Sequence, residues 1–222
     1  PANARRVAEQ LSQFRGAAMK VGQLLSMAAG DLLPPELGEI LSRLRADARP
    51  MPMSQLIGVL NEHWGEGWEQ HFTKFSFTPM AAASIGQVHS AHDQRGRRLA
   101  IKVQYPGVRQ SISSDVDNVA SLLRISGLLP KSLDIQPLLD EAKCQLYAEA
   151  DYHVEAAHLT HFRALLADRP DFLLPEVQET LSNVNILAMS HVEGEPVEAL
   201  ARASQVERDR VVGLLFELLF RE

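Results

Sequence analysis

The sequence of 222 residues predicts an α+β fold, in which helices come first and an antiparallel sheet follows. Apolar residues recur at alternating spacings of four and three over residues 3–29, which is a helical period. From Lys74 to Gln104 the period becomes that of strands, with turn residues between the apolar runs. The composition is that of a globular protein, and the net charge of −6 gives no reason to expect a nucleic-acid partner.

Proline residues help to locate the ends of the remaining elements, because proline is tolerated in the first turn of a helix and ends a strand by lacking an N–H donor. Pro106, for example, ends the third strand. The elements predicted after residue 29 are, in chain order, a short helix between Pro35 and Pro50, a helix over 54–63, three strands over 74–104 with a turn at Asp93–Gly96, helices over 108–126 and 136–167, strands over 173–180 and 184–192, and a helix from about 204.

Several features bound the class of protein. No apolar stretch approaches the roughly 18–20 residues that a membrane-spanning helix needs, and the polar N-terminus is no signal peptide. We therefore expect a soluble protein or one peripheral to a membrane. A single cysteine, Cys144, excludes a disulfide framework and is expected to be a small apolar filler in a helix. The chain begins at Pro1 and stops inside an amphipathic helix, so we expect a fragment of a longer protein.

Lys102 is the first candidate for chemistry. It lies in the apolar strand "LAIKVQ", with its side chain opposite to those of Ile101 and Val103. An edge-strand lysine that points to water is one interpretation. A loop upstream of the strand favours a second one, because backbone N–H groups and a lysine together commonly hold a phosphate.

A carboxylate cluster follows in "EADYHVEA". Helical periodicity over 136–167 continues the apolar stripe of Leu139 and Leu146 to Glu149, and Glu155 falls on the neighbouring stripe with Asp151 between them. Acids near an apolar face require cations, and the periodicity does not decide which of Glu149 and Glu155 pairs with Lys102.

Lys20 is the other available cation. It shares a helix face with Gly16, Gln23 and Met27, and a lysine and a glutamine among small residues suggest a helix that docks through a polar contact. Gly16 and Gly22 weaken a helix, so close backbone approach is their expected reason. A solvated lysine is the alternative interpretation. The histidines of the 136–167 helix complete no ligand set, and we predict no metal site among these residues.

Four motifs in order, "RGAAMKVGQLLSM", "AAASIGQVHSA", "AIKVQYPGV" and "EADYHVEAAH", resemble the UbiB family of atypical protein-kinase-like proteins, which supports coenzyme Q (ubiquinone) biosynthesis. The resemblance implies a protein-kinase-like N-lobe, with a five-stranded antiparallel sheet and an αC-type helix, behind an N-terminal helical extension. The C-lobe would be missing from this chain. Domain bounds of 1–72 for the extension, 73–195 for the N-lobe and 196–222 for the hinge and start of the C-lobe follow.

The resemblance also implies roles for particular residues. Lys20, Gly22 and Gln23 match a KxGQ motif that restricts access to the nucleotide, and Glu149 and Asp151 match an ExD motif that looks like the partner of Lys20. Lys102 resembles the lysine that contacts the phosphates, and Glu155 resembles the helix glutamate paired with it. The implied ATP-binding set is Ala81, Ala82, Ala83, Ser84, Ile85, Gly86, Lys102, Met189, His191 and Val192.

The expected function is that of an ATP-binding atypical kinase or ATPase in ubiquinone biosynthesis, which needs Mg²⁺ whose ligands lie beyond the chain end. No "DFG" occurs, so these residues alone are expected to be inactive. The location is expected to be the cytoplasm or the periphery of the inner membrane in a bacterium, or the mitochondrial matrix in a eukaryote. The alternative is a non-catalytic module, in which nucleotide gates binding of lipid or of quinone-biosynthesis enzymes. An ordinary Ser/Thr kinase is disfavoured, because the extension would obstruct a peptide.

Overall fold

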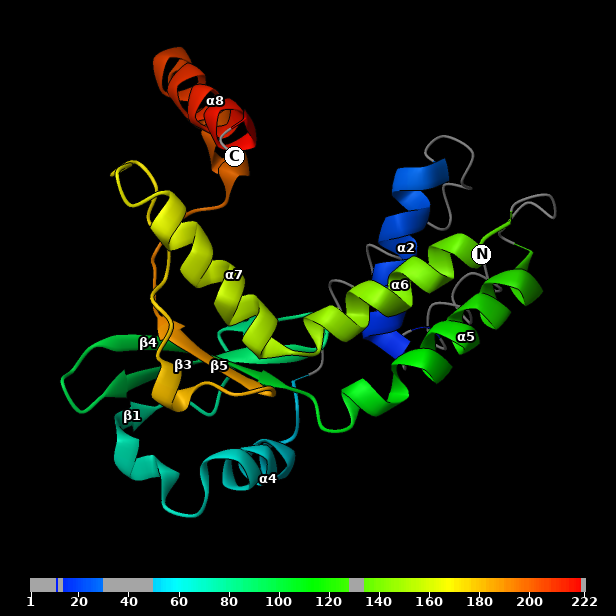
Figure 1. Cartoon of the computed structure of the whole chain (residues 1–222), viewed down its shortest axis with the longest axis horizontal. Coiled ribbons are helices and arrows are strands. Elements are labelled where there is room, and N and C mark those ends of the chain that lie inside the picture. Colours follow the sequence, from blue (N-terminus) through cyan, green and yellow to red (C-terminus); the bar gives the residue numbers. More distant parts are fainter. Residues whose placement is uncertain (1–10, 12–13, 30–49, 128–133, 221–222) are drawn as a thin grey trace.

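The computed structural model describes residues 11, 14–29, 50–127 and 134–220, and Figure 1 shows their arrangement. A twisted sheet lies beside a group of three helices, and a long helix runs from that group across the sheet (Figure 1). The elements are α2 (Arg15–Ala29), α4 (Met53–Trp64), the 3₁₀ helix η3 (Trp68–His71), β1 (Phe72–Phe75), β2 (Ala81–Ala82), β3 (Gly86–Asp93), β4 (Arg98–Gln104), α5 (Val108–Ser126), α6 (Gln136–Glu149), α7 (Tyr152–Leu165), η4 (Glu179–Leu181), β5 (Ile186–Ser190), η5 (Val197–Arg202) and α8 (Gln205–Phe220).

The sheet has five antiparallel strands, which confirms the predicted fold class. Its order is β1-β3-β4-β5, and the short β2 also pairs with β3. Val88 lies opposite Lys102 across the β3–β4 pair, and Lys102 lies opposite Leu187 on β5. Since side chains alternate along a strand, Lys102 shares its face of the sheet with Ala100 and Arg98.

The strand assignment differs from the prediction in two places. The run before the loop forms two strands instead of one, because Ser76–Met80, which contains Pro79, separates β1 from β2. The strand predicted over 173–180 was wrong: only Val177 bridges to β5, opposite Met189. Pro175 has no N–H group to donate to a neighbouring strand. The chain then turns into η4, after which the Ser182 hydroxyl accepts the Ala188 N–H at 3.0 Å.

The helix predicted over 136–167 is two helices, and this too is a correction. The helix α6 ends at Glu149, and Asp151 takes an extended conformation with φ −127° and ψ 97°. Its side chain accepts the His153 N–H at 3.1 Å and so caps α7. Aspartate is a preferred N-cap residue, because its carboxylate satisfies a free N–H of the first turn. The break redirects the chain from the helical group onto the sheet (Figure 1).

Two separate apolar cores hold the fold together. The helical core packs α2, α5 and α6 against one another, and its buried residues include Val21, Leu25, Val116 and Leu146. The sheet core packs α4 and η3 against the sheet, and its buried residues include Leu56, Trp68, Ile101 and Ile186. Both tryptophans of the chain belong to the sheet core, with ring centroids 5.8 Å apart.

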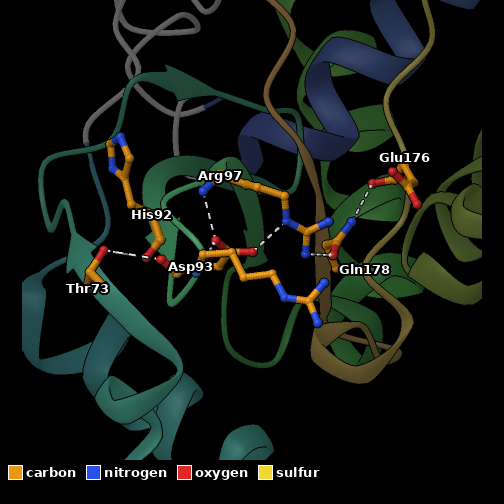
Figure 2. A network of polar contacts seen from close by, with 7 residues as sticks. Thr73, His92, Asp93, Arg97, Glu176 and Gln178 are labelled. Carbon is orange, nitrogen blue, oxygen red and sulfur yellow. Dashed lines mark hydrogen bonds and ion pairs between the residues drawn. The ribbon is translucent and has the colours of Figure 1, made fainter.

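A polar network closes the turn between β3 and β4, as Figure 2 shows. The Asp93 carboxylate accepts backbone N–H groups of Arg95 and Arg97 at 2.9 and 2.8 Å, and the Arg97 Nε at 2.7 Å. Burial raises the pKa of Asp93, but the hydrogen bonds from Arg97 and Arg95 outweigh it and lower the pKa overall. Gly96 has φ of +77°, the left-handed conformation that this predicted turn requires.

Some predictions fall outside the described residues: the helix between Pro35 and Pro50, and the first part of the helix over 3–29. The predicted helices over 54–63, over 108–126 and from about 204 are confirmed as α4, α5 and α8. Cys144 lies exposed on α6, so its expected role as an apolar filler was wrong. No helix within the described ranges is long and apolar enough to cross a membrane.

Candidate nucleotide site

Lys102 and Glu155 form an ion pair between the sheet and the first turn of α7. The Lys102 Nζ lies 2.8 and 2.6 Å from the two carboxylate oxygens of Glu155. Their side chains are 19% and 41% exposed, so the lysine is held at the surface of the sheet and does not reach freely into water. Of the two glutamates that periodicity left open, Glu155 is the one that contacts Lys102.

The Tyr152 ring packs against the Lys102 ammonium of this pair. Its ring lies 4.7 Å from the Lys102 Nζ, a distance at which an ammonium is attracted to an aromatic face. The residue is 1% exposed, and its backbone N–H donates to the Val184 carbonyl at 3.1 Å. Burial, followed by the charges of Glu155 and Glu149, raises the pKa of Tyr152 well above its usual range. Its ring is therefore a neutral platform, fixed between α7 and the segment before β5.

The loop from Ala81 to Gly86 approaches the same face of the sheet. Ala81 and Ala82 pair with Val88 and Gln87, and the Ala83 N–H donates to the Gly86 carbonyl at 2.9 Å. None of the described alanines or other non-glycine residues has a positive φ, so this loop does not use the left-handed freedom of glycine. It is a tight turn of ordinary backbone.

Gly86 is required for a different reason than flexibility. A Cβ built at Gly86 would lie 2.3 Å from the carbonyl oxygen of Val103 on the neighbouring strand. Glycine therefore permits β3 and β4 to approach closely at the base of the loop. Ile85 beside it is buried in the helical core, so the loop is anchored on both sides.

Lys20 on α2 forms an ion pair with Glu149 at the end of α6. The second oxygen of Glu149 accepts a hydrogen bond from the Ser84 hydroxyl at 3.1 Å. One carboxylate thus joins three segments: the N-terminal helix, the end of α6 and the alanine-rich loop. The side chains of Lys20 and Glu149 are 13% and 37% exposed, so the contact is partly shielded from solvent.

Close approach explains Gly16 on the same helix. A Cβ there would meet the Ser84 carbonyl oxygen and the Ile85 Cγ2, both at 3.1 Å. The expectation that α2 uses glycine for close packing is met at this position. Because the neighbours are backbone and a core side chain, a larger residue at Gly16 would push α2 away from the loop.

The other predicted site residues do not take part in these two ion pairs. Gln23 is exposed, and Gly22 is buried. Asp151, expected near Lys20, instead caps α7. Met189 lies opposite Ala100 on β5, and the His191 N–H donates to the Arg98 carbonyl at 3.0 Å, with Val192 following in the connection.

Two groups of residues were missed in the sequence. Tyr152 stands between the two acids of the cluster, and an aromatic residue there was a signal that could have been used. Val88 and Ala100 are half-buried on the face that carries Lys102, and they offer a small apolar floor beside Met189. Strand alternation alone would have placed both residues there.

No group of acidic, histidine or cysteine side chains within the described part of the chain could hold a metal ion. Three features define the candidate site chemically: a positioned ammonium, an alanine-rich loop without positive φ angles and an apolar floor. An ammonium held by a carboxylate can bind a phosphate oxygen, and an apolar floor next to it can accept a flat ring.

Comparisons with known proteins agree with the class that this fold defines, a protein-kinase-like domain. Residues 43–222 match the ABC1 atypical kinase-like domain, and the chain belongs to this family. This confirms the resemblance to the UbiB family of atypical kinases.

Particular relatives narrow the class. The chain is 41% identical to the mitochondrial atypical kinase coq-8 of Caenorhabditis elegans over 221 residues, which are 100% of this chain and 29% of that protein. It is 42% identical to the mitochondrial atypical kinase COQ8 of Saccharomyces cerevisiae, covering 99% of this chain and 44% of that protein. The chain therefore spans less than half the length of these relatives.

A solved structure is also similar. The Mycobacterium tuberculosis protein Rv3197, in complex with erythromycin, superposes with a TM-score of 0.58 and 33% identity. The match covers 89% of this chain and 50% of that one.

Proposed function

We propose that this chain forms the nucleotide-binding lobe and N-terminal extension of an atypical kinase or ATPase that binds ATP and acts in ubiquinone biosynthesis. The observation that carries the proposal is the Lys102–Glu155 pair, with contacts of 2.8 and 2.6 Å on an open sheet face beside the alanine-rich loop. In this site Lys102 holds the phosphates, Glu155 and the Tyr152 ring orient it, and Val88, Ala100 and Met189 receive the base. The residues Ala81–Gly86 shape the phosphate side, and His191 and Val192 lie near the base.

The Lys20–Glu149–Ser84 contacts give the extension its role in the proposal. Because Glu149 contacts α2 and the loop at once, movement of α2 changes the loop that faces the phosphates. The extension thus regulates access to nucleotide, and Gly22 and Asp151 act by shaping α2 and α7. The division into 1–72, 73–195 and 196–222 belongs to the same proposal, as does a mitochondrial matrix location in a eukaryote, in line with the names of the relatives.

Mg²⁺ supplies charge neutralisation of the phosphates in kinases generally. The described residues offer no ligand group for it, so no step of this proposal passes through the metal. We expect these 222 residues to bind ATP without turning it over. Steady ATP hydrolysis by the purified chain that disappears in Lys102→Ala would contradict this expectation.

The direct test is calorimetric titration of the purified chain with ATP and ADP. Lys102→Ala is expected to weaken ATP binding by about tenfold or more, because a charge-assisted contact to phosphate is lost. Lys143→Ala is the matched control, since Lys143 pairs with Asp117 at 2.7 Å on the outer surface of α5 and α6. Equal ATP affinity in both variants, with unchanged circular dichroism, would refute the nucleotide site.

The stiff loop has a test of its own. Ala82→Gly is expected to change the ratio of ATP to ADP affinity, because glycine admits conformations that alanine excludes at this turn. Ala167→Gly, at an exposed turn after α7, controls for a general effect of glycine on flexibility. An unchanged ratio in Ala82→Gly would remove the loop from the selection of nucleotide. Nucleotide binding without any turnover in a longer form of the protein would favour a nucleotide-gated binding module.

A further inference from the structure

A basic pocket lies on the sheet away from Lys102. It has a volume of about 460 Å³ and is lined by Lys74, Ser76, Ser90, His92 and Arg98. These residues come from β1, the segment after it, β3 and β4, so the pocket is built on the most regular part of the fold. No acidic side chain lines it among the described residues, in a chain whose net charge is −6.

Strand register aligns the three basic side chains. Lys74 lies opposite His92 across β1 and β3, and His92 lies opposite Arg98 across β3 and β4. Neighbouring strands are about 4.8 Å apart, so the three side chains form a row on one face. Lys74 and Arg98 thus bring two cationic side chains to this face on either side of His92.

The available hydrogen-bond donors agree with an anion site. Lys74 has no ion-pair partner in the described ranges, and the buried Nδ1 of His92 has no hydrogen-bond partner there. Arg98 does pair with Glu193, but Glu193 is 77% exposed, and the guanidinium keeps its remaining N–H groups. The nearest acid on β3, Asp93, is occupied by Arg97, and Figure 2 shows the His92 ring pointing away from that network.

This pocket lies on the sheet face that carries Lys102 but farther along it, with Ser90 opposite Ala100 of the apolar floor. The pair His92–Arg98 and the pair Val88–Lys102 are four residues apart along β3 and β4, which is about 13 Å. Lys102 has a carboxylate partner in Glu155, whereas Arg98 of the row pairs with the exposed Glu193 at its edge. The pocket lining shares no residue with the set assigned to nucleotide in the proposed function.

We propose that the pocket of Lys74, His92 and Arg98 binds a phosphate-type anion, with Ser90 as an additional hydroxyl contact, whereas the Ser76 hydroxyl donates to the Thr78 carbonyl at 2.9 Å. A free phosphate and a phosphate monoester headgroup of a lipid present the same chemistry to these donors. Three basic groups with one hydroxyl suit a tetrahedral oxyanion better than a single planar carboxylate, because the donors come from three strands.

The test uses nuclear magnetic resonance of the chain carrying Lys102→Ala, which removes the competing phosphate contact. Inorganic phosphate, at constant ionic strength against chloride, is expected to shift the amide signals of Ser90 and His92. Adding Lys74→Ala or Arg98→Ala is expected to weaken this binding by about tenfold each. Arg95→Ala, on the exposed turn beside the pocket, is the matched control and is expected to leave it unchanged.

A second arm distinguishes the two sources of phosphate. Vesicles of phosphatidylcholine containing phosphatidic acid are compared with phosphatidylcholine alone, in a flotation assay with the same variants. Flotation that needs phosphatidic acid, Lys74 and Arg98 identifies a headgroup as the source. Phosphate binding without flotation identifies a free anion. Absence of both, or binding that Lys74→Ala and Arg98→Ala leave intact, overturns the proposal.

Discussion

The helical core and the sheet core hold this chain together in different ways. The helical core of α2, α5 and α6 is built from aliphatic side chains such as Leu25 and Val116. The sheet core adds aromatic packing around Trp68 to the ladder hydrogen bonds of β3 and β4. The helical core thus depends on side-chain packing between helices, whereas backbone pairing also secures the sheet core.

The candidate nucleotide site lies where the two cores meet. Lys102 lies on strand β4, whose Ile101 and Val103 belong to the sheet core, and Lys20 lies on a helix of the helical core. The two lysines pair with glutamates on either side of the break between α6 and α7. Ile85 inserts the alanine-rich loop into the helical core. The same short segments therefore connect both cores, through Glu149, Ser84 and Ile85.

The largest expected effect comes from truncating each core. Leu25→Ala and Ile101→Ala each remove a fully buried side chain and should cost about 2–5 kcal/mol. Tryptophan fluorescence reports the sheet core, because both tryptophans lie there, and far-UV circular dichroism reports the helices. In urea, Leu25→Ala should shift the dichroism midpoint more, and Ile101→Ala the fluorescence midpoint. Equal shifts in both signals would mean that the chain unfolds as one cooperative unit, in which the helical core and the sheet core do not differ in stability.

Removing the two boundary ion pairs should have a smaller effect, about 1 kcal/mol each, because both glutamates are more than one-third exposed. The two ion-pair variants should loosen different parts of the chain. Glu149→Gln should release α2 and speed tryptic cleavage after Lys20, whereas Glu155→Gln should leave that cleavage rate unchanged and weaken ATP binding. Mass spectrometry of the digest measures the first outcome. Faster cleavage in both variants would show that the pairs do not act separately.

The sheet core should also carry a pH dependence that the helical core lacks. Gln87 accepts the Met51 N–H at 2.8 Å, so its amide NH₂ faces the Nε2 of His89, whose Nδ1 donates to the Ser76 carbonyl. Burial lowers the pKa of His89 from its ordinary 6.5, against the opposing effect of the Ser76 carbonyl.

At pH values between the lowered pKa of His89 and 6.5, the unfolded chain binds more protons than the folded chain. The contribution of neutral His89 to the free energy of unfolding is therefore fully present above pH 6.5 and is lost as the pH falls. One histidine contributes at most about 1.4 kcal/mol per pH unit. The free energy of unfolding from urea titrations at pH 7.5 and 5.5 should therefore fall less in His89→Gln than in the parent chain. An identical fall would exclude His89 as the source.

The smallest effect is expected at Tyr152, where loss of the buried hydroxyl should stabilise the folded chain. The buried Tyr152 hydroxyl has no hydrogen-bond partner within the described residues, so Tyr152→Phe removes an uncompensated desolvation cost and should gain about 1 kcal/mol. Tyr147→Phe, on the exposed side of α6, should be neutral. Thermal unfolding measures both, and a destabilised Tyr152→Phe would show that the hydroxyl has a partner.

Much of the fold was predictable, because apolar periodicity reports which face of each element is buried. Helix α5 was predicted at its observed bounds, and the turn at Gly96 and the strand that carries Lys102 were also found. The break at Asp151 was not, since the stripe through Leu139 and Leu146 continues smoothly to Glu149 and a single capping side chain decides the change. The strand over 173–180 failed because a proline and a side-chain hydrogen bond limited it to one bridge.

The sequence by itself determined the family and most of the helices and strands, and it singled out two lysines and two glutamates that the structure pairs. It could do so because these features depend on local spacing and on motifs in order. Only the tertiary structure decided that Lys102 takes Glu155 and Lys20 takes Glu149, that Tyr152 lies beneath Lys102, and that Lys74, His92 and Arg98 form one row. Such partnerships depend on strand register and on the angle between two helices, and neither is written in the periodicity of a single segment.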